Sequence, residues 1–306
     1  MTNPAAVPVI HPSWFSRAMA GTALPVLIIT AAIVLIWYAA TVYMNSTMQI
    51  DRFERAGQDW SYEELVVATM SQERPLLPAP HQVVVEMAKT IFGKKPTSKR
   101  SLVYHSWVTL SSTLLGFSAG ALLGILLATG IVHSKALEKS LLPWIISSQT
   151  IPILAIAPMV IVVLGAMGIK GLVPKATISM YLGFFPVAIS MVKGLRSPDL
   201  LQMDLMRTYN ASRFQYFSLL RWPSSIPFLF ASLKIAVAIS LIGAIVGELP
   251  TGAQAGLGAR LLAGSYYGQT IQIWSALFTA AFLSACLVGL IGVAERIVLR
   301  RMGARQ

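Results

Sequence analysis

Apolar residues gather in six long runs along the chain, and polar residues separate these runs. Each run holds about the 20 mainly apolar residues that a helix needs to cross the hydrocarbon core of a bilayer. The pattern therefore predicts an all-α membrane protein with six transmembrane helices. The six predicted spans are Gly21–Met44, His105–Val132, Leu141–Met167, Leu172–Val192, Ile226–Glu248 and Ile271–Leu299.

Prolines interrupt two of these spans. Pro143, Pro152 and Pro158 lie in the third span, and Pro174 and Pro186 lie in the fourth. A proline frees a backbone carbonyl, which a membrane-spanning helix tolerates only where neighbouring groups bind that carbonyl. We therefore expect both spans to be kinked and buried within a bundle.

Lysine and arginine fall unevenly on the short loops between the spans. One side of the membrane receives Arg17, Lys135, Lys139, Lys193, Arg196, Arg207, Arg213, Arg221, Arg296, Arg300, Arg301 and Arg305. The short loops of the other side receive only Lys170, Lys175 and Arg260. Because cytoplasmic loops carry the positive excess, we expect both termini in the cytoplasm.

This orientation divides the chain into five segments. We expect a cytoplasmic N-terminus over 1–20, a first transmembrane helix over 21–44, a periplasmic segment with an amphipathic helix over 45–104, a five-helix core over 105–299 and a cytoplasmic tail over 300–306. The amphipathic pattern covers Val83 to Phe92. Two interpretations of the outer segment stay open, an ordered cap on the surface and a docking surface for a partner.

Composition and charge support a membrane protein. Of the 306 residues, 55% are hydrophobic and 12% are charged, whereas a soluble domain carries roughly a quarter charged residues. The mean hydropathy is +0.67. The formal net charge of +12 lies in loops between apolar runs, so we discount nucleic-acid binding.

The sequence holds few of the groups that enzymes and metal sites need. Cys286 is the single cysteine, and the four histidines are dispersed without metal-ligand spacing. No G-x-x-x-x-G-K-[ST] phosphate loop occurs. We therefore expect no catalytic residue, no metal and no cofactor in this chain.

One stretch between the fourth and fifth spans, Ser197–Pro227, is charged and sharply punctuated. Ser197 suits the N-cap of a helix and Pro198 its first position, so a short helix is expected to run to about Tyr209. Asn210 would end it, because asparagine reaches the left-handed conformation found at helix ends.

A second short helix is predicted directly after this break. Ser212 suits its N-cap, the helix covers Arg213–Arg221, and Pro223 would stop it. Two short helices at an angle, at a membrane surface, form a structure to which a partner can bind.

This stretch resembles the EAA signature of the membrane subunits of bacterial ABC importers, E-A-A, three residues, G-A-S-R, and later Leu-Pro with another proline. Asp204 takes the acid position and Asn210 the glycine position, while Ala211-Ser212-Arg213 match. Trp222-Pro223 replaces Leu-Pro, and Pro227 follows in place. Leu205 and Met206 replace the two alanines of the signature.

Other segments resemble the nitrate/sulfonate/taurine/pyrimidine-precursor branch of these importers. They are Leu77-Pro78-Ala79-Pro80, Thr109-Leu110 with Gly116-Phe117, and Gly247-Glu248 followed by Gly256-Leu257-Gly258. Ser112 stands where the branch usually has an arginine. The resemblance covers about Leu77 to Leu299.

The resemblance implies a permease subunit with the type I ABC importer fold, in the bacterial inner membrane. Such subunits form homodimers, receive a small polar or anionic solute from a periplasmic or lipid-anchored solute-binding protein, and bind two cytoplasmic ATPase subunits that hold ATP and Mg²⁺. The coupling helices would transmit ATPase closure to the spans. The expected ATPase-coupling residues are Asp204, Arg207, Asn210, Ala211, Ser212, Arg213, Trp222 and Pro223.

Candidates for the substrate path are polar residues in or near spans. Ser147, Ser148, Gln149 and Thr150 precede Pro152, where they could bind a polar solute or form interhelical hydrogen bonds. Glu248 could meet substrate or brace the glycine-rich segment Pro250–Gln269, and we favour bracing. Lys234 could line the path, or it could snorkel or pair, which we favour.

Two other functions compete with an importer permease. An ion-gradient-driven secondary transporter usually needs carboxylates at mid-membrane, which the predicted spans lack. A membrane scaffold or channel would not associate with an ATPase.

Overall fold

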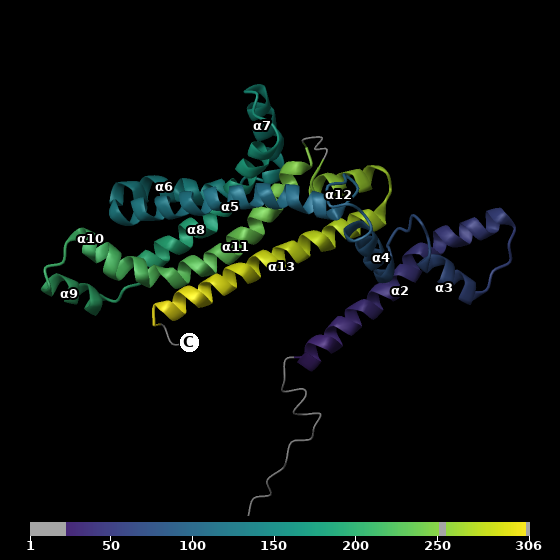
Figure 1. Cartoon of the computed structure of the whole chain (residues 1–306), viewed down its shortest axis with the longest axis horizontal. Helices are drawn as coiled ribbons and strands as arrows, with labels where there is room; N and C mark the ends of the chain where they lie inside the picture. Colours follow the sequence, from purple (N-terminus) through teal and green to yellow (C-terminus); the bar gives the residue numbers. More distant parts are fainter. Residues whose placement is uncertain (1–22, 251–254, 304–306) are drawn as a thin grey trace, which may run out of the picture. The chain divides into compact units, whose positions relative to one another are not determined.

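The structure, a computed structural model, describes residues 23–250 and 255–303, and every regular element in these ranges is a helix (Figure 1). The helices are α2 Ala23–Ala56, α3 Tyr62–Met70, α4 Pro80–Ile91, α5 Leu102–His133, α6 Lys135–Ser148, α7 Ile153–Ala166, α8 Leu172–Leu195, α9 Leu200–Thr208, α10 Arg213–Gln215, α11 Trp222–Glu248, α12 Leu257–Tyr266 and α13 Thr270–Arg301, with a π-helical turn, η1, over Tyr216–Arg221. The predicted N-terminal segment 1–20, the start of the first span at Gly21, and residues 304–306 lie outside the described ranges.

The prediction of an all-α membrane protein is confirmed. Within the described ranges, five helices are long and apolar enough to cross a membrane, or six if the bent pair α6 and α7 counts as one span. The described residues fold as two compact units, divided between Val84 and Val85.

The first unit is built around α2, which extends further than the predicted span. α2 has 34 residues and ends at Ala56 rather than Met44. At about 1.5 Å per residue it is about 51 Å long, against about 30 Å for the hydrocarbon core. It is therefore longer than a straight crossing of the hydrocarbon core requires, and its C-terminal part, 45–56, overlaps the segment 45–104 that the sequence predicts to lie outside.

Asn45, which is fully buried, holds the returning chain against α2. Its Oδ1 accepts the N–H groups of Leu76 at 2.8 Å and Leu77 at 3.2 Å, and its Nδ2 donates to the Leu77 carbonyl at 2.9 Å. Trp37 Nε1 donates to the Pro78 carbonyl at 3.0 Å. Residues 45–78 thus form an ordered helical hairpin, while a docking role for it stays a prediction. The predicted amphipathic helix is found as α4.

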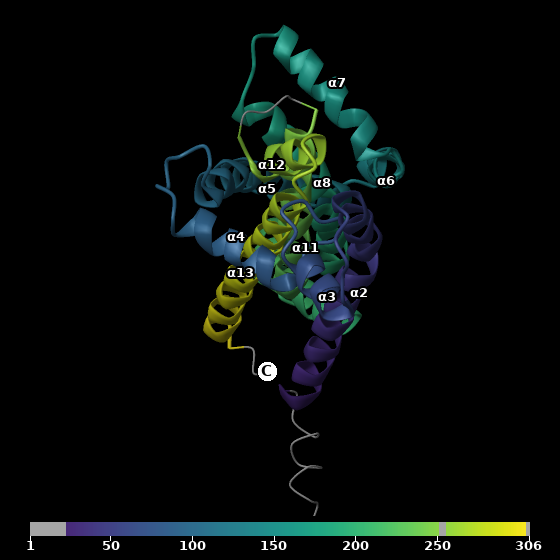
Figure 2. The same cartoon turned by 90° about the vertical axis from the view of Figure 1, so that its right-hand side faces the viewer.

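The centre of the second unit is α8, which packs between α5 and α11 (Figures 1 and 2). Glycines permit this close packing. A Cβ at Gly120 of α5 would lie 2.9 Å from the Met180 carbonyl oxygen, and one at Gly124 would lie 2.8 Å from the Phe184 carbonyl oxygen. On the other side, Ser179 Oγ donates to the Ser240 carbonyl at 2.8 Å, and Ser240 Oγ donates back at 3.2 Å.

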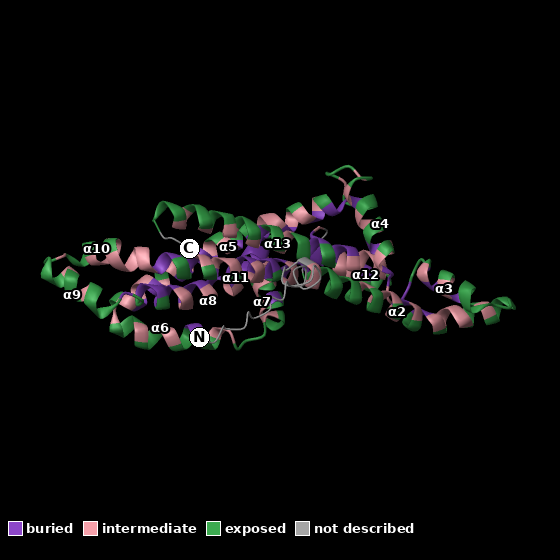
Figure 3. Cartoon of the chain, turned by 90° about the horizontal axis from the view of Figure 1, so that it is seen from below, coloured by how far each residue is buried: buried purple, intermediate pink, exposed green. Residues whose placement is uncertain are grey.

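Many of the buried residues lie on α5, α8 and α11, where these helices pack together (Figure 3). Over half of the most apolar 18-residue window of α8 is buried, which confirms that the fourth span is buried, while its kink stays a prediction. The third span differs, because it is two helices bent by 101° rather than one kinked helix. The break falls at Pro152, which stands in an extended conformation before α7. α7 stands away from the bundle, and Ala157 is its only buried residue, so the prediction that this span is buried is wrong.

An ion pair joins the fifth and sixth predicted spans. Lys234 Nζ of α11 pairs with Glu295 of α13. The expectation that Lys234 pairs or snorkels is therefore confirmed as pairing. α9 and α10 lie at one end of the second unit and α12 lies at the other (Figure 1).

Candidate functional site

The predicted coupling stretch begins with α9, which starts later than expected. Its N-cap is Asp199, whose carboxylate accepts the Leu200 N–H at 2.8 Å, while Gln202 Oε1 accepts the Asp199 N–H at 3.3 Å. Ser197 instead donates to the Gly194 carbonyl at 2.7 Å. The prediction of Ser197 as the cap is wrong, because a carboxylate two residues on is a good cap that also complements the helix dipole.

The break after α9 has the predicted conformation. Asn210 has φ of 50°, the one positive φ among described residues other than glycine. Its N–H donates to the Arg207 carbonyl at 2.9 Å, and the next N–H, of Ala211, donates to the Met206 carbonyl at 3.0 Å. These bonds satisfy carbonyls that the helix end leaves free.

Ser212 caps the following helix, as predicted. Its Oγ accepts the Gln215 N–H at 3.3 Å, and Gln215 Oε1 accepts the Ser212 N–H at 2.8 Å. This reciprocal capping box fixes the angle at which the chain leaves the turn. Arg213 is exposed at the first helical position.

The second predicted short helix is not separate. Residues Arg213–Glu248 form one continuous helix of 36 residues, which passes through η1 and includes Trp222 and Pro223 at the start of α11. The prediction that Pro223 stops a helix is wrong, because the π turn before it changes the hydrogen-bond register, and proline is tolerated at such a start. The Asn210–Arg213 turn is therefore continuous with a helix that is long and apolar enough to span the membrane.

The surface of α9 and the turn is exposed and partly apolar. No residue of α9 is buried. Asp204 and Arg207 form the predicted local pair at 3.0 Å, with side chains 65% and 74% exposed, so the pair adds little to stability. The large exposed apolar residues here are Leu200, Leu201, Leu205, Tyr209 and Phe214. Contiguous exposed apolar side chains of this kind mark interaction surfaces.

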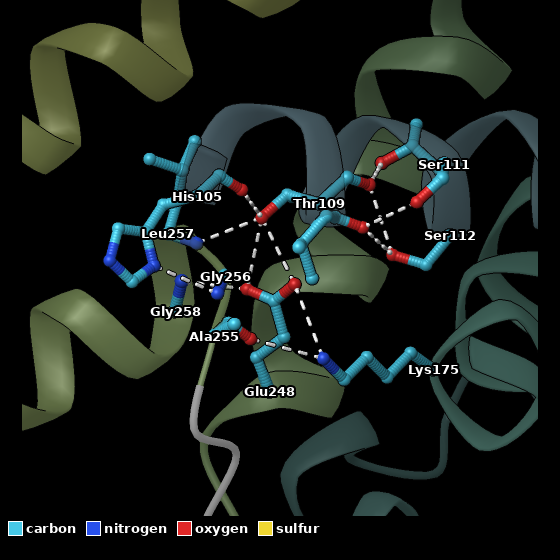
Figure 4. A network of polar contacts seen from close by, with 12 residues as sticks. His105, Thr109, Ser111, Ser112, Lys175, Glu248, Ala255, Gly256, Leu257 and Gly258 are labelled. Atoms are coloured by element: carbon cyan, nitrogen blue, oxygen red, sulfur yellow. Dashed lines mark hydrogen bonds and ion pairs between the residues drawn. The ribbon is translucent and has the colours of Figure 1, made fainter. Parts of the chain in front are cut away.

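A second polar cluster lies at the opposite end of the second unit, around Glu248 (Figure 4). Glu248, the last residue of α11, is fully buried. The Thr109 hydroxyl of α5 lies 3.0 and 3.1 Å from its two carboxylate oxygens and donates to them. Lys175 of α8 adds an ion pair at 3.8 Å. Three helices therefore meet at one carboxylate.

Side chains of this cluster bind three consecutive backbone N–H groups at the start of α12. Gly256 donates to His105 Nδ1 at 3.0 Å, Leu257 donates to Thr109 Oγ1 at 2.8 Å, and Gly258 donates to Glu248 at 2.8 Å. His105 Nε2 lies 2.9 Å from the Lys99 carbonyl. Since Nδ1 accepts, Nε2 carries the proton, and the imidazole is neutral.

Two glycines let the loop approach this carboxylate. Gly256 has φ of 124°, and a Cβ there would overlap the Glu248 carboxylate. A Cβ at Gly258 would lie 2.8 Å from Glu248 Cβ. Lys175 Nζ also donates to the Ala255 carbonyl at 3.2 Å. Glu248 therefore braces the glycine-rich segment, and a role for it in the substrate path stays a prediction.

Sequence reasoning singled out Glu248 but not its partners His105, Thr109 and Lys175. Thr109 and the glycines did stand in segments that resemble one importer branch, and this was the available signal. Contact between positions 139 residues apart cannot be deduced from local pattern.

The polar residues Ser147 to Thr150 lie at the α6–α7 break. Ser148 Oγ donates to the Ile145 carbonyl at 2.7 Å and Thr150 Oγ1 to the Ser147 carbonyl at 2.8 Å. Tyr181 of α8 donates to the Ser148 carbonyl. Their side chains thus bond mostly within their own helix end. Among the described residues, no group of three or more His, Cys, Asp or Glu side chains could hold a metal ion.

Comparisons with known proteins agree with this architecture. A family model described as "Binding-protein-dependent transport system inner membrane component" matches residues 120–304, more than half of the chain. A probable ABC transporter permease protein of Haemophilus influenzae is 32% identical over 191 residues, which are 62% of this chain and 76% of the relative.

Two further relatives have named solutes. The riboflavin transport system permease protein RibX of Chloroflexus aurantiacus is 31% identical over 196 residues, 64% of this chain and 71% of its own. The formylaminopyrimidine transport permease protein ThiX of Halalkalibacterium halodurans is 31% identical over 196 residues, 63% and 72%. A crystal structure of an amino acid ABC transporter with histidines matches with a TM-score of 0.54 at 18% identity, covering 64% of this chain and 92% of that one.

Proposed function

The chain belongs to the family of inner-membrane components of binding-protein-dependent transport systems, and on that premise we propose how it is driven. It is a multi-pass permease of the ABC importer type for a small solute, and its family is one of transport permeases rather than enzymes. We propose that the Asn210–Arg213 turn docks on a separate cytoplasmic ATPase subunit and conveys its closure to α11.

One observation carries this proposal. The exposed turn continues without a break into the helix Arg213–Glu248, which is long and apolar enough to span the membrane. On its other side, α9 leads back to α8 through four residues, Arg196 to Asp199. A force on the turn therefore acts on two adjacent spans, which are packed together through Ser179 and Ser240.

The proposed assembly is a homodimer with two ATPase subunits and a solute-binding protein. ATP and Mg²⁺ would be bound by the ATPase subunits, with no cofactor in this chain. The proposed orientation places both termini, α9 and the turn in the cytoplasm, and α12 on the outer side, because the lysine and arginine excess follows that division. Motion of helix bundles around a fixed site is an established route to alternating access.

The solute is proposed to be small and polar or anionic. Ser147 to Thr150 at the α6–α7 break are proposed to face its path, because polar groups beside a helix break are available in an otherwise apolar region. An ion-gradient-driven transporter is not favoured. Among the described residues of the spans, Lys234 is paired with Glu295 and Glu248 is bonded to Thr109 and Gly258.

Co-purification tests the proposal. The chain is expressed with the ATPase encoded beside it and purified in mild detergent, and ATP hydrolysis is measured after reconstitution in lipid. We expect the ATPase to co-purify with the native chain. The variant carrying Ser212→Glu with Arg213→Glu should insert into the membrane but no longer co-purify with the ATPase. The control is Lys170→Glu, an exposed cation far from the turn in sequence. A native chain that never brings down an ATPase would refute the proposal.

A further inference from the structure

The helix that joins the coupling turn to the membrane has one irregular point, the π turn η1. Residues Tyr216–Arg221 are π-helical, and the Trp222 N–H donates to the Phe217 carbonyl, five residues back. Pro223 accounts for this register, because it has no N–H to offer the carbonyl of Leu219 and its ring would crowd that carbonyl in a regular α-helix. Single π turns inside helices are frequent at functional sites.

Phe217 ties this irregular turn to a second helix. Its ring centroid lies 5.2 Å from that of His133, the last residue of α5, and 6.1 Å from that of Trp222. The edge-to-face geometry with His133 is a preferred one for ring pairs. Phe217 and Trp222 also pack against the main hydrophobic core, which contains Met191 and Leu195 of α8. The π turn therefore rests on the ends of α5 and α8.

The Arg221 side chain beside this packing is not fully hydrogen-bonded in the present conformation. Its guanidinium lies over the Tyr216 ring, with Cζ 5.1 Å from the centroid. Its Nε is buried and has no hydrogen-bond partner among the described residues. A buried donor without a partner is costly, and such groups in native structures call for an explanation. A second conformation that supplies an acceptor is one such explanation.

We propose that η1 is the joint through which the Asn210–Arg213 turn moves α11, with Phe217 as its positioning residue. This inference rests on the proposed function and adds to it the position in the helix at which the turn and α11 move relative to each other. The helix is regular on either side of η1, so bending or a one-residue change of register is easiest there. Phe217 fixes the resting angle because it is held between α5 and the start of α11.

The test follows the motion of α11 without needing the transported solute. The full chain, with Cys286→Ser, is reconstituted in lipid with its ATPase subunits. Reporter thiols are introduced one at a time, by Ile242→Cys on α11 or Leu290→Cys on α13, both exposed side chains. The rate of labelling by N-ethylmaleimide is measured with and without ATP plus vanadate, which traps the closed ATPase.

With the native joint, nucleotide should change the labelling rate at position 242 by about threefold or more, as expected for a shift between two states. Phe217→Ala and deletion of Ser218, which removes one residue from the π turn, should abolish that change while the ATPase stays bound. Phe217→Tyr and Ser218→Ala are the matched controls and should preserve it. In the absence of nucleotide, the labelling rate of the thiol at position 290 should be the same in the Phe217 and Ser218 variants as in the native protein.

The outcomes distinguish failure of η1 as the joint from failure of the proposed function. A native-sized response in both Phe217→Ala and the Ser218 deletion would overturn the joint. Loss of ATPase binding in both variants would also overturn it, because η1 would then belong to the docking surface. If Phe217→Ala does not yield folded protein, Phe217→Leu takes its place. Absence of the ATPase, or of any nucleotide response in the native protein, would instead overturn the proposed function.

Discussion

Thr109 and Glu248 lie 139 positions apart, and the threonine hydroxyl donates to both oxygens of the buried carboxylate at 3.0 and 3.1 Å. The same hydroxyl oxygen accepts the Leu257 N–H at 2.8 Å. One side chain thus joins α5, the end of α11 and the start of α12. This relationship makes this end of the second unit sensitive to single substitutions.

Thr109→Val should destabilise the protein by about 2 kcal/mol, because it leaves the Glu248 carboxylate and the Leu257 N–H short of a partner. The measurement is thermal unfolding of the purified protein in detergent. Thr113→Val is the control, because among the described residues the Thr113 hydroxyl bonds only to the Thr109 carbonyl of its own helix at 2.8 Å. Equal losses in the two variants would contradict the bridging role of Thr109.

Gly256→Ala should abolish the folded protein or lower its yield severely. The added Cβ would overlap the Glu248 carboxylate, and the backbone would be strained at φ of 124°. Gly268→Ala separates the two causes, since Gly268 has φ of 63° and nothing within 4 Å of the added atom. That control should lose only about 1 kcal/mol from backbone strain. Yield of monodisperse protein on size exclusion is the readout.

Lys175→Met should be more harmful alone than together with Glu248→Gln. The single change leaves the buried carboxylate without its counter-charge, which costs about 3–5 kcal/mol in comparable buried pairs. The double variant removes both charges and keeps an acceptor for the Gly258 N–H. A double-mutant cycle on unfolding free energy measures this coupling. Additive losses would show that the 3.8 Å pair does not act as a unit.

Asn210→Val should weaken docking of the ATPase, whereas Asn210→Gly should not. The backbone φ of 50° is unfavourable for a β-branched residue by about 1–2 kcal/mol and is free for glycine. The ratio of co-purified ATPase to permease checks the expectation. Both variants should insert into the membrane at the native level, and normal docking of the valine variant would contradict the role of the turn.

The sequence predicted the parts of this fold that depend on local physics. Six apolar runs indicated the spans, and Asn210 and Ser212 indicated the left-handed break and the cap that follows it. Asp199 displaced Ser197 as a cap because two good capping residues stood close together. The α6–α7 break at Pro152 was expected only as a kink, since proline alone does not say whether a helix bends or stops.

Other parts depend on contacts that a local pattern does not contain. The hairpin after α2 exists because Asn45 binds the backbone of Leu76 and Leu77, more than 30 positions later. The Glu248 cluster depends on the packing of α5, α8 and α11 against one another. The continuation of the helix past Pro223 was missed because the rule that proline ends a helix competes with its tolerance near a helix start.

The unbroken helix α11 also fixes the rotation of its C-terminal end relative to its N-terminal end. From Pro223 to Glu248 it counts 248 − 223 = 25 positions, which is about seven turns, so both residues lie on nearly the same face. An insertion of one residue between them would rotate Glu248 by about 100° away from Thr109 and Gly258. Even a change by whole turns, which restores the face, would shift Glu248 along the axis by about 1.5 Å per residue, so the length of this helix between its two ends should tolerate little change.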